Sequence, residues 1–394
     1  MPQKITVLSN QSAADAGTDA LGFAFSDAVT ALGRFPETRL NYFGSDIFCS
    51  PEAFRTNFLS SCRRLMAHGN ASAEKLINAI KTSDAFLLGD IRGLSAAEWV
   101  PALALSRNSV AWVFSDWPRE FPAGDPVWSV YRHGTFSRRL IASACMKLAY
   151  KGEPTRRDRL TPITTAIFAN ESLLERNSQS FPQLERAYVI PPPIDTDVFK
   201  FKPMTSARCK SWGWIGNLET DYDDAVVALR IFAFEALQNP ECRFYIASEL
   251  YSSEAQKILA QVRGHPALAP RVSFLNPPQN KVALAAMLRD FGVLVEPRRR
   301  RKNEFPQLVV VALACGCFPL CGRDGETEML LRDTPEMFFP ADAPSAAFLR
   351  CEKIKAFSPE MRTEMLAAYA EKLAKTAAPE VVSSKLLEVI LPEA

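Results

Sequence analysis

The chain has 394 residues, of which 47% are hydrophobic and 23% are charged, and its formal net charge is +2 at pH 7. One hydrophobic core rarely supports so long a chain, so two domains are expected. A charge this close to zero argues against general affinity for nucleic acid, so any electrostatic function must be local. Nine cysteines without paired spacing indicate free thiols in a reducing, cytoplasmic compartment.

Neither a targeting segment nor a metal site is predicted. Lys4 is followed by only the short run 5–8 before polar residues, which is too short for a signal peptide. The longest apolar run, 308–321, is too short to span a bilayer. Cys315, Cys317 and Cys321 come nearest to a cluster, but their spacing is not a usual zinc arrangement. We therefore expect a soluble or peripheral protein that needs no metal.

The first half of the chain alternates apolar runs with helical segments. Strands are predicted at 5–8, 40–43, 85–88, 110–114 and 163–168, and helices at 19–32, 51–67, 73–80 and 170–176. Strands that alternate with helices in this way predict a parallel sheet covered on both faces.

A linker and a second set of elements follow. Pro191, Pro192 and Pro193 remove three N–H donors and fix an extended path, which excludes a central strand or a helix there. Beyond them, strands are predicted at 211–215, 244–247 and 272–275, and helices at 224–237 and 282–288. Two α/β halves joined by a hinge leave a cleft between them, which is a common place for a ligand.

The stretch from Asp290 to Glu328 carries the main candidate site. An apolar strand at 291–295 stops at Glu296, five consecutive cations follow at 298–302, and a buried helix is predicted at 308–314. Gly316 is well placed to end that helix in the left-handed conformation, before a further strand from 318. In a parallel sheet such a loop lies at the carboxyl ends of the strands, where the helix N-terminus offers N–H groups to an anion.

Four segments together resemble a known family. The linker Ile190–Phe199, IPPPIDTDVF, resembles the IPNGVDTDxF linker of the retaining glycosyltransferases of the large GT-B family 4. Ala312–Pro319 is similar to that family's EAMACGxPV segment, Trp214–Leu218 to its xVGRL turn, and Ala166–Leu174 to its vaxSexl strand and helix. These motifs stand in the family's order, across about residues 5 to 340.

The resemblance implies a GT-B fold, which is an α/β architecture of two Rossmann-like parallel-sheet domains with a cleft between them. It implies an N-terminal acceptor domain at 1–190, a Pro-rich hinge at 191–202 and a C-terminal nucleotide-sugar domain at 203–358. Helices at 359–394 are expected to pack partly back on the N-terminal domain. The family requires no cofactor and no divalent metal.

The chain departs from the family where the donor is held. The family's Glu-x7-Glu motif would place its carboxylates at Asn303 and Val311, and a valine cannot accept hydrogen bonds from ribose hydroxyls. Glu304 lies one position late and can substitute for the first carboxylate if the loop is shifted by one residue. The basic pair that normally grips the diphosphate is also missing, because Asn217 and the acidic run 221–224 stand in its region.

The basic loop is the candidate replacement for that pair. Guanidinium groups suit phosphate oxygens, so its arginines can supply the charge from a different loop. A solvated charge run explains the same residues equally well, and both interpretations stay open. The predicted donor-binding residues are Gly216, Asn217, Arg298, Arg299, Arg300, Arg301, Asn303, Phe305, Pro306, Gln307 and Leu308.

Asp116 and Glu304 are the predicted catalytic residues, and Gly17 and Asn170 the predicted acceptor-binding residues. A carboxylate after the strand at 110–114 can orient an acceptor hydroxyl or act as a base. Capping of the turn at Trp117 explains Asp116 at least as well. A glycine at a strand–helix turn, such as Gly17, is equally a backbone requirement.

The segment 131–160 holds eight lysines or arginines with apolar residues at helical spacing between them. It can lie on the inner face of a membrane and serve a lipid-linked acceptor. A core-facing helix with a cationic outer side is the plainer interpretation, and the sequence favours it.

The sequence therefore predicts a glycosyltransferase that moves a sugar from a nucleotide-sugar donor to an acceptor hydroxyl, with retention of configuration. The acceptor can be a carbohydrate, a lipid-linked molecule or a protein. The alternative is a non-catalytic GT-B partner subunit or sugar-binding scaffold that has lost its donor-binding residues, which Val311 supports.

Overall fold

The computed structural model describes residues 3–8, 38–43, 82–89, 109–113, 163–178, 184–299, 304–340 and 345–391, and isolated residues at 24, 27–28, 30–32, 34–35, 79 and 343. The chain forms two compact units. Unit 1 comprises Met1–Ala16, Ala28–Pro191 and Val382–Ala394, and unit 2 comprises Gly17–Asp27 and Pro192–Val381.

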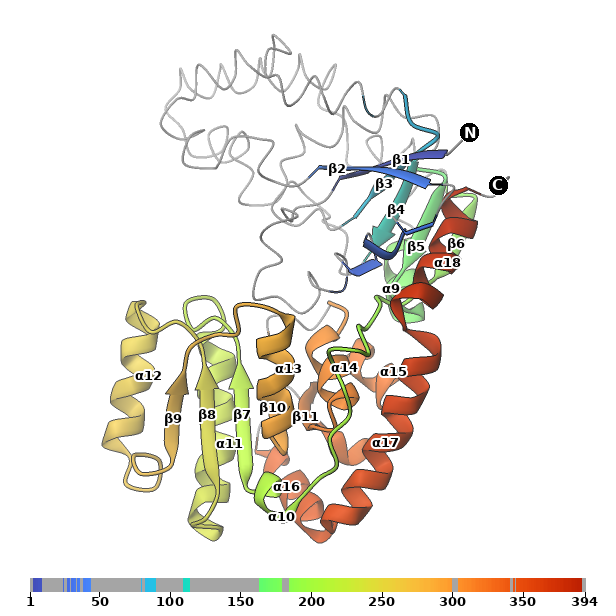
Figure 1. Cartoon of the computed structure of the whole chain (residues 1–394). Helices are drawn as coiled ribbons and strands as arrows, with labels where there is room; N and C mark the ends of the chain where they lie inside the picture. Colours follow the sequence, from blue (N-terminus) through green and yellow to red (C-terminus); the bar gives the residue numbers. More distant parts are fainter. Residues whose placement is uncertain are drawn as a thin grey trace, which may run out of the picture. The chain divides into compact units, whose positions relative to one another are not determined.

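Unit 1 is built on a parallel sheet (Figure 1). Its strands are β1 (Gln3–Leu8), β2 (Thr38–Phe43), β3 (Ala85–Leu88), β4 (Ser109–Val113), β5 (Thr165–Phe168) and β6 (Arg186–Val189), in the order β2-β1-β3-β4-β5-β6. Helix α9 (Glu171–Asn177) follows β5, and most of the last helix, α18 (Pro379–Ile390), also belongs to this unit. The buried Ser383 hydroxyl donates to the Ala28 carbonyl (3.2 Å) and so ties α18 to the start of the chain.

Unit 2 holds a second parallel sheet, in the order β12-β11-β10-β7-β8-β9. Its strands are β7 (Ser211–Ile215), β8 (Arg243–Ala247), β9 (Val272–Leu275), β10 (Val293–Glu296), β11 (Phe318–Arg323) and β12 (Phe338–Pro340). Its helices are α10 (Ser206–Cys209), α11 (Tyr222–Gln238), α12 (Ser253–Gly264), α13 (Lys281–Asp290), α14 (Gln307–Ala314), α15 (Gly325–Leu330), η3 (Pro335–Met337), α16 (Ala346–Ala356) and α17 (Pro359–Thr376). Counted from β7, this order is the 3-2-1-4-5-6 arrangement of the Rossmann fold.

The predicted fold class of two parallel-sheet domains is confirmed. β3, β7 and β9 have the predicted bounds, and the other predicted strands are shifted by one or two residues. The helices expected at 51–67 and 73–80 lie outside the described residues, apart from one helical position at 79. β6, β12, α10 and α12 were not predicted. β6 is only half-buried and runs directly into the prolines, so it lacks the apolar run that marks a central strand.

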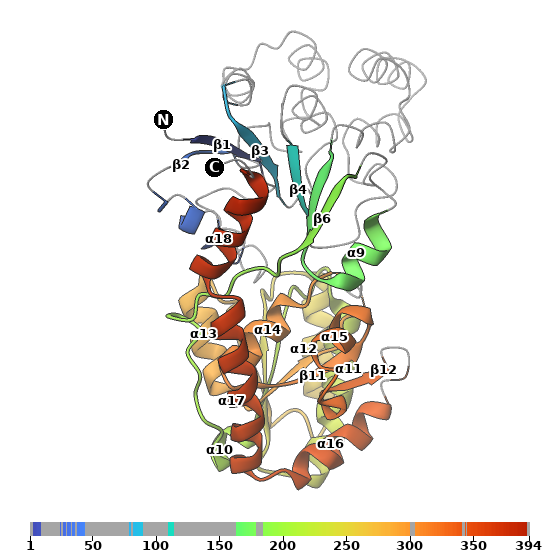
Figure 2. The same ribbon diagram turned by 90° about the vertical axis from the view of Figure 1, so that its right-hand side faces the viewer.

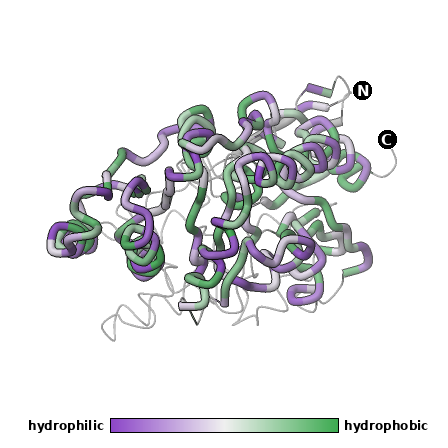
Figure 3. Tube along the Cα trace, turned by 90° about the horizontal axis from the view of Figure 1, so that it is seen from below, coloured by the Kyte–Doolittle hydropathy of each residue, from purple (hydrophilic) through white to green (hydrophobic). Residues whose placement is uncertain are grey.

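The core of unit 2 lies between its sheet and the helices that cover it. Trp212, Trp214, Phe232 and Phe244 are buried there, and the rings of the last two stack with centroids 4.9 Å apart. Helix α14 packs against α13, α17 and the sheet, and Figure 2 shows α17 running beside it. In Figure 3 the helices carry hydrophobic and hydrophilic residues in alternation along the tube. Such helices bury one face and expose the other.

The turn between α14 and β11 has the predicted conformation. Gly316 has φ = +70°, in the left-handed region that glycine adopts without steric cost. A Cβ at this position would lie 2.4 Å from the Lys202 carbonyl oxygen, so no larger residue fits.

A buried arginine joins three segments of unit 2. The Arg208 guanidinium donates to five backbone carbonyls, those of Lys202 (2.6 Å), Pro203 (3.0 Å), Leu288 (3.3 Å), Phe291 (2.8 Å) and Gly316 (3.1 Å). These acceptors lie in the hinge segment, at the end of α13 and just after α14. Because carbonyl groups at helix ends carry negative partial charge, they stabilise a buried cation. Burial lowers the pKa of Arg208 from its usual value.

Candidate functional site

The switch point of the unit 2 sheet lies between β7 and β10. The chain leaves β7 toward β8 and β9, and it returns to the other side of β7 as β10. In open α/β sheets, ligands bind in the crevice outside the carboxyl ends of the strands at such a point. The described residues at this edge of the sheet are 216–221, after β7, and 297–299 and 304–306, after β10.

The backbone N–H groups of the loop after β7 are all hydrogen-bonded within the protein. Its six N–H groups all have acceptors: Gly216 donates to the Ala247 carbonyl (3.2 Å), Asn217 to Asp221 Oδ2 (3.3 Å), Leu218 to Ser248 Oγ (3.0 Å), Glu219 to Asn217 Oδ1 (2.9 Å), and Thr220 and Asp221 to the Asn217 carbonyl (3.1 and 2.7 Å). A phosphate-binding loop of the glycine-rich kind presents free N–H groups, so this loop does not work in that way.

Two of the loop's predicted donor residues are explained by local structure. A Cβ on Gly216 would lie 2.5 Å from the Trp214 ring, so the glycine permits close packing. Exposed Asn217 forms a turn through its side-chain oxygen. Whether either residue also contacts a ligand stays a prediction.

The acidic run after β7 faces inward. Asp221 and Asp224 are buried, and Asp224 Oδ1 accepts the Arg299 N–H (3.0 Å). This bond joins the start of α11 to the loop after β10 across the switch point. Asp224 therefore ties the start of α11 to the loop after β10, while Asp221 accepts the Asn217 N–H within the loop after β7 (3.3 Å). Sequence reasoning missed this role, because four polar residues before a helix also fit an exposed cap.

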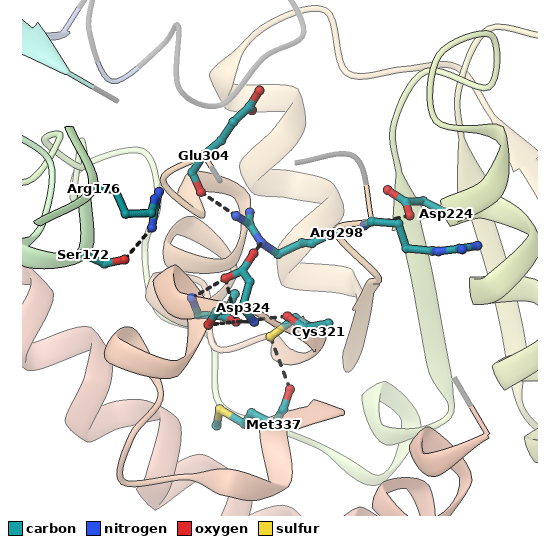
Figure 4. Close-up of polar contacts among 11 residues, drawn as sticks. Ser172, Arg176, Asp224, Arg298, Glu304, Cys321, Asp324 and Met337 are labelled. Carbon is teal, nitrogen blue, oxygen red and sulfur yellow. Dashed lines mark hydrogen bonds and ion pairs between the residues drawn. The ribbon is translucent and has the colours of Figure 1, made fainter. Parts of the chain in front are cut away.

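Arg298 is buried and has φ = +57°, a left-handed conformation that costs a non-glycine residue about 1–2 kcal/mol. Its Nε donates to Asp324 Oδ2 (2.9 Å), and its Nη2 donates to the Glu304 carbonyl (Figure 4). The side chains of Arg298 and Asp324 are only 4% and 8% exposed. The guanidinium thus closes the base of its own loop and pairs with the N-cap of α15.

The next residue in the basic run, Arg299, is exposed. Arg300, Arg301 and Asn303 lie outside the described residues. The diphosphate role predicted for Arg298 to Arg301 stays a prediction.

Glu304 is half-buried, and its backbone carbonyl faces Arg298. In Figure 4 its side-chain carboxylate points away from Arg298. Its predicted catalytic role is untested.

Helix α14 begins at the edge of the crevice without a side-chain cap. Its N-cap is Pro306, preceded by half-buried Phe305, and Leu308 is half-buried within the first turn. The buried Gln307 amide donates from Nε2 to the Pro193 carbonyl (3.3 Å), while no described residue pairs with its Oε1. A buried acceptor without a partner among the described residues is unusual, and a water molecule or a ligand hydroxyl can supply the donor.

Val311 lies one helical turn beyond Gln307, on α14, and is 1% exposed. It stands where the resemblance expects a carboxylate. The valine is enclosed in the protein interior, so nothing at this position can accept a hydrogen bond from a ribose.

The remaining predicted residues give less information. Asp116, Gly17 and the basic segment 131–160 lie outside the described residues. Asn170 is the N-cap of α9, and its Oδ1 accepts the Leu173 N–H (2.9 Å), so capping alone accounts for it and acceptor binding stays untested. Within α9, Arg176 donates to the Ser172 hydroxyl (2.6 Å; Figure 4).

Within the part of the chain that the structure describes, no three metal-ligating side chains gather. No helix among these same residues is long and apolar enough to cross a membrane. Cys315, Cys317 and Cys321 are buried, and burial raises the pKa of each thiol, to about 12 for Cys315. Such thiols are protonated and inert at neutral pH.

No family model and no characterised protein sequence matches the chain. Solved structures do. Sucrose-phosphate synthase from Thermosynechococcus elongatus is 14% identical with a TM-score of 0.63, and the match covers 98% of this chain and 97% of that one. Anabaena HepE in complex with UDP and glucose is 13% identical with a TM-score of 0.61, and trehalose-6-phosphate synthase OtsA has the same values. Each of these two matches covers 98% of both chains. The chain has a GT-B fold.

Proposed function

We propose that this protein is a glycosyltransferase that takes a sugar from a nucleotide-sugar donor bound in the switch-point crevice of unit 2. The observation that carries the proposal is the match along nearly the whole chain to proteins of this activity, including HepE with UDP-glucose and with UDP alone. The Rossmann strand order supports this location, because ligands of open α/β sheets bind outside the carboxyl ends of the strands at the switch point, which here lies between β7 and β10. Transfer with retention, to an acceptor held by unit 1, completes the proposal.

In this reaction the bond between the anomeric carbon and the diphosphate oxygen breaks, the acceptor oxygen forms the new bond to the anomeric carbon, and the proton of the acceptor hydroxyl passes to the departing diphosphate. Negative charge therefore grows on the departing diphosphate, and fixed positive charge near it lowers the barrier. The amides of residues 216–221 are already bonded, so side chains must supply most of this charge. Exposed Arg299, next to the crevice, is the described residue that fits this role.

Gln307 fits the same site for a different reason. Its Oε1, which has no partner among the described residues, lies in the first turn of α14 and can accept a hydrogen bond from a sugar or ribose hydroxyl. The α14 N-terminus adds a positive partial charge. We expect no metal or other cofactor in this reaction.

A second function is favoured by specific observations. Val311 and the internally bonded loop after β7 remove two usual contacts to a donor. A non-catalytic GT-B partner subunit or sugar-binding scaffold would have no need of these contacts.

Thermal unfolding with nucleoside diphosphates tests the proposal. Uridine diphosphate at about 100 times its Kd should add about 2.7 kcal/mol of stability. For a domain of this size the melting temperature should rise by roughly 5–11 °C. Arg299→Ala should weaken uridine diphosphate binding about tenfold and leave uridine binding unchanged, because only the diphosphate carries charge. Arg230→Ala, which removes an exposed arginine in the middle of α11, is the matched control.

An assay of uridine diphosphate release, combined with thermal unfolding, separates the two functions. Release of uridine diphosphate from UDP-glucose in the presence of an acceptor supports the transferase. Binding without release under any acceptor supports the scaffold. No rise in melting temperature with uridine, guanosine, adenosine or thymidine diphosphate would exclude the transferase.

A further inference from the structure

Arg298 stands in the basic run, but its environment differs from that of its exposed neighbour Arg299. Arg298 is bonded inside the protein, where its Nε donates to Asp324 and its Nη2 donates to the Glu304 carbonyl. The side chain is 4% exposed, so it lies beneath the surface of the crevice rather than on it. A ligand in the crevice meets Arg299 more readily than Arg298.

Asp324 uses its two carboxylate oxygens for two different segments. Oδ2 accepts from Arg298 (2.9 Å), and Oδ1 accepts the Thr327 N–H (2.8 Å), which caps α15. β10 and β11 are paired in register, with Glu296 opposite Cys321, so the loops that follow them start side by side. The ion pair therefore locks the loop after β10 to the start of the loop after β11.

The left-handed backbone at Arg298 sets the direction in which the chain continues. Directly after it, the Arg299 N–H bonds to Asp224 on α11 (3.0 Å). At the other end of the loop, the Glu304 carbonyl bonds back to the Arg298 guanidinium, three residues before α14 begins. An unfavourable conformation persists only where surrounding contacts hold it, and these contacts hold it here.

We propose that Arg298 is a positioning residue, paired with Asp324, that fixes the turn presenting Arg299 and the start of α14 to a diphosphate. This inference rests on the proposed function for the identity of the ligand. The role of Arg298 in holding the turn does not depend on the proposed function, because it follows from the contacts within unit 2. The resemblance to family 4 implies no role for the pair of Arg298 and Asp324, which we infer from the contacts of this chain alone.

Two substitutions separate positioning from direct binding. Arg298→Met removes the guanidinium but keeps an apolar stem. Asp324→Asn keeps a good N-cap for α15 and removes only the charge that holds Arg298. A positioning role predicts that both variants raise the Kd of uridine diphosphate about tenfold, the loss of one charge-assisted contact. Both should change the Kd of uridine less than twofold. If Arg298 instead binds the phosphate, Asp324→Asn frees it and leaves uridine diphosphate binding unchanged or stronger, which overturns the inference.

Arg298→Lys and Arg323→Met are the reference variants. Lysine keeps one charge but lacks the fork that reaches both Asp324 and Glu304, so an intermediate Kd is expected. Arg323 directly precedes Asp324, and its pair with Glu328 is exposed, with side chains 50% and 48% accessible. Arg323→Met should bind uridine diphosphate as the unmodified protein does. An equal loss in Arg323→Met would show a general charge effect and overturn the inference.

Amide hydrogen exchange tests the mechanical role without any ligand. In Arg298→Met the Arg299 amide should exchange at least tenfold faster, because its bond to Asp224 depends on the turn; in Arg323→Met it should not. An unchanged rate in Arg298→Met would overturn the inference whatever binds to the protein. If the rate increases but the unmodified protein binds no nucleoside diphosphate, the proposed function fails while the role of Arg298 in holding the loop stands.

Discussion

Replacing Arg208 is the most direct test of how unit 2 is held together. Its guanidinium donates to five backbone carbonyls from three segments, and three of these bonds, to Leu288, Phe291 and Gly316, are buried. Arg208→Met keeps the apolar stem and removes every donor. The carbonyls at the ends of α13 and α14 then lose their partner, and the hinge segment loses its tie to both helices.

The expected cost follows from the buried acceptors. Each one left without a partner costs about 1–3 kcal/mol. Three of them would cost several kcal/mol, and removing a buried cation relieves part of its desolvation penalty. We expect a net loss of about 4 kcal/mol, against a total stability that is typically about 5–15 kcal/mol. Arg208→Lys should lose about half as much, because an ammonium has three donors for five acceptors.

Urea unfolding at 25 °C, followed by amide exchange on the strands of unit 2, measures this loss. Arg243→Met is the matched control. Arg243 also donates only to backbone carbonyls, those of Pro240 and Cys242 (both 3.2 Å), but its side chain is exposed. It should lose less than about 1 kcal/mol. Equal losses in the two variants would show that the buried carbonyl cluster adds nothing, and the reasoning would fail.

Two further predictions concern Val311 and Lys281. Val311→Glu should unfold unit 2 or lower its melting temperature sharply, because an enclosed carboxylate without a partner is costly, while Val311→Ala isolates the lost packing; a stable variant that binds uridine more tightly would contradict this. Lys281 Nζ lies 2.6 Å from Asp27 Oδ1 and 2.6 Å from Asp195 Oδ2. Burial alone would lower the pKa of Lys281, but its hydrogen bonds to Asp195 and Asp27 raise this pKa above the usual 10.5. Burial alone would raise the pKa of Asp195, but the hydrogen bond from Lys281 lowers this pKa below the usual 3.8. Lys281→Met should therefore cost about 1–2 kcal/mol near neutral pH, and in pH-dependent urea unfolding the difference should vanish as pH falls below 3.8 or rises above 10.5. A pH-independent difference would exclude the ion pairs as its source.

The fold was predictable where one local cause decides the structure. The buried strands β3 and β7 are apolar runs bounded by polar or small residues. The glycine at position 316 directly after an apolar helix predicts the left-handed turn that ends α14. β6 escaped prediction because it is half-buried and polar at Arg186, so hydrophobic pattern gives little signal. Its neighbour β5 supplies what pattern does not, a parallel partner that satisfies its backbone.

The sequence predicts a candidate location for the site but not the contacts that the structure shows there. The carboxyl end of β10 is a natural ligand position from topology alone. The pairing of Arg298 with Asp324 spans 26 residues, and it depends on a backbone angle that the sequence of a basic run does not encode. Arg208 gave no signal either, because a single arginine in a short polar segment is normally on the surface.

The contacts of the crevice determine which kind of ligand it can hold. The amides of the loop after β7 are bonded within the protein, and the acidic residues Asp221 and Asp224 serve as internal acceptors. One arginine of the basic run is committed to the fold, and the next is exposed. Recognition through guanidinium groups acts on charge that remains in contact with solvent, so it weakens as salt increases, whereas a cradle of amides is less sensitive. Under the proposed function, in which the exposed Arg299 binds the diphosphate, this chain should therefore discriminate a diphosphate from a nucleoside mainly by charge.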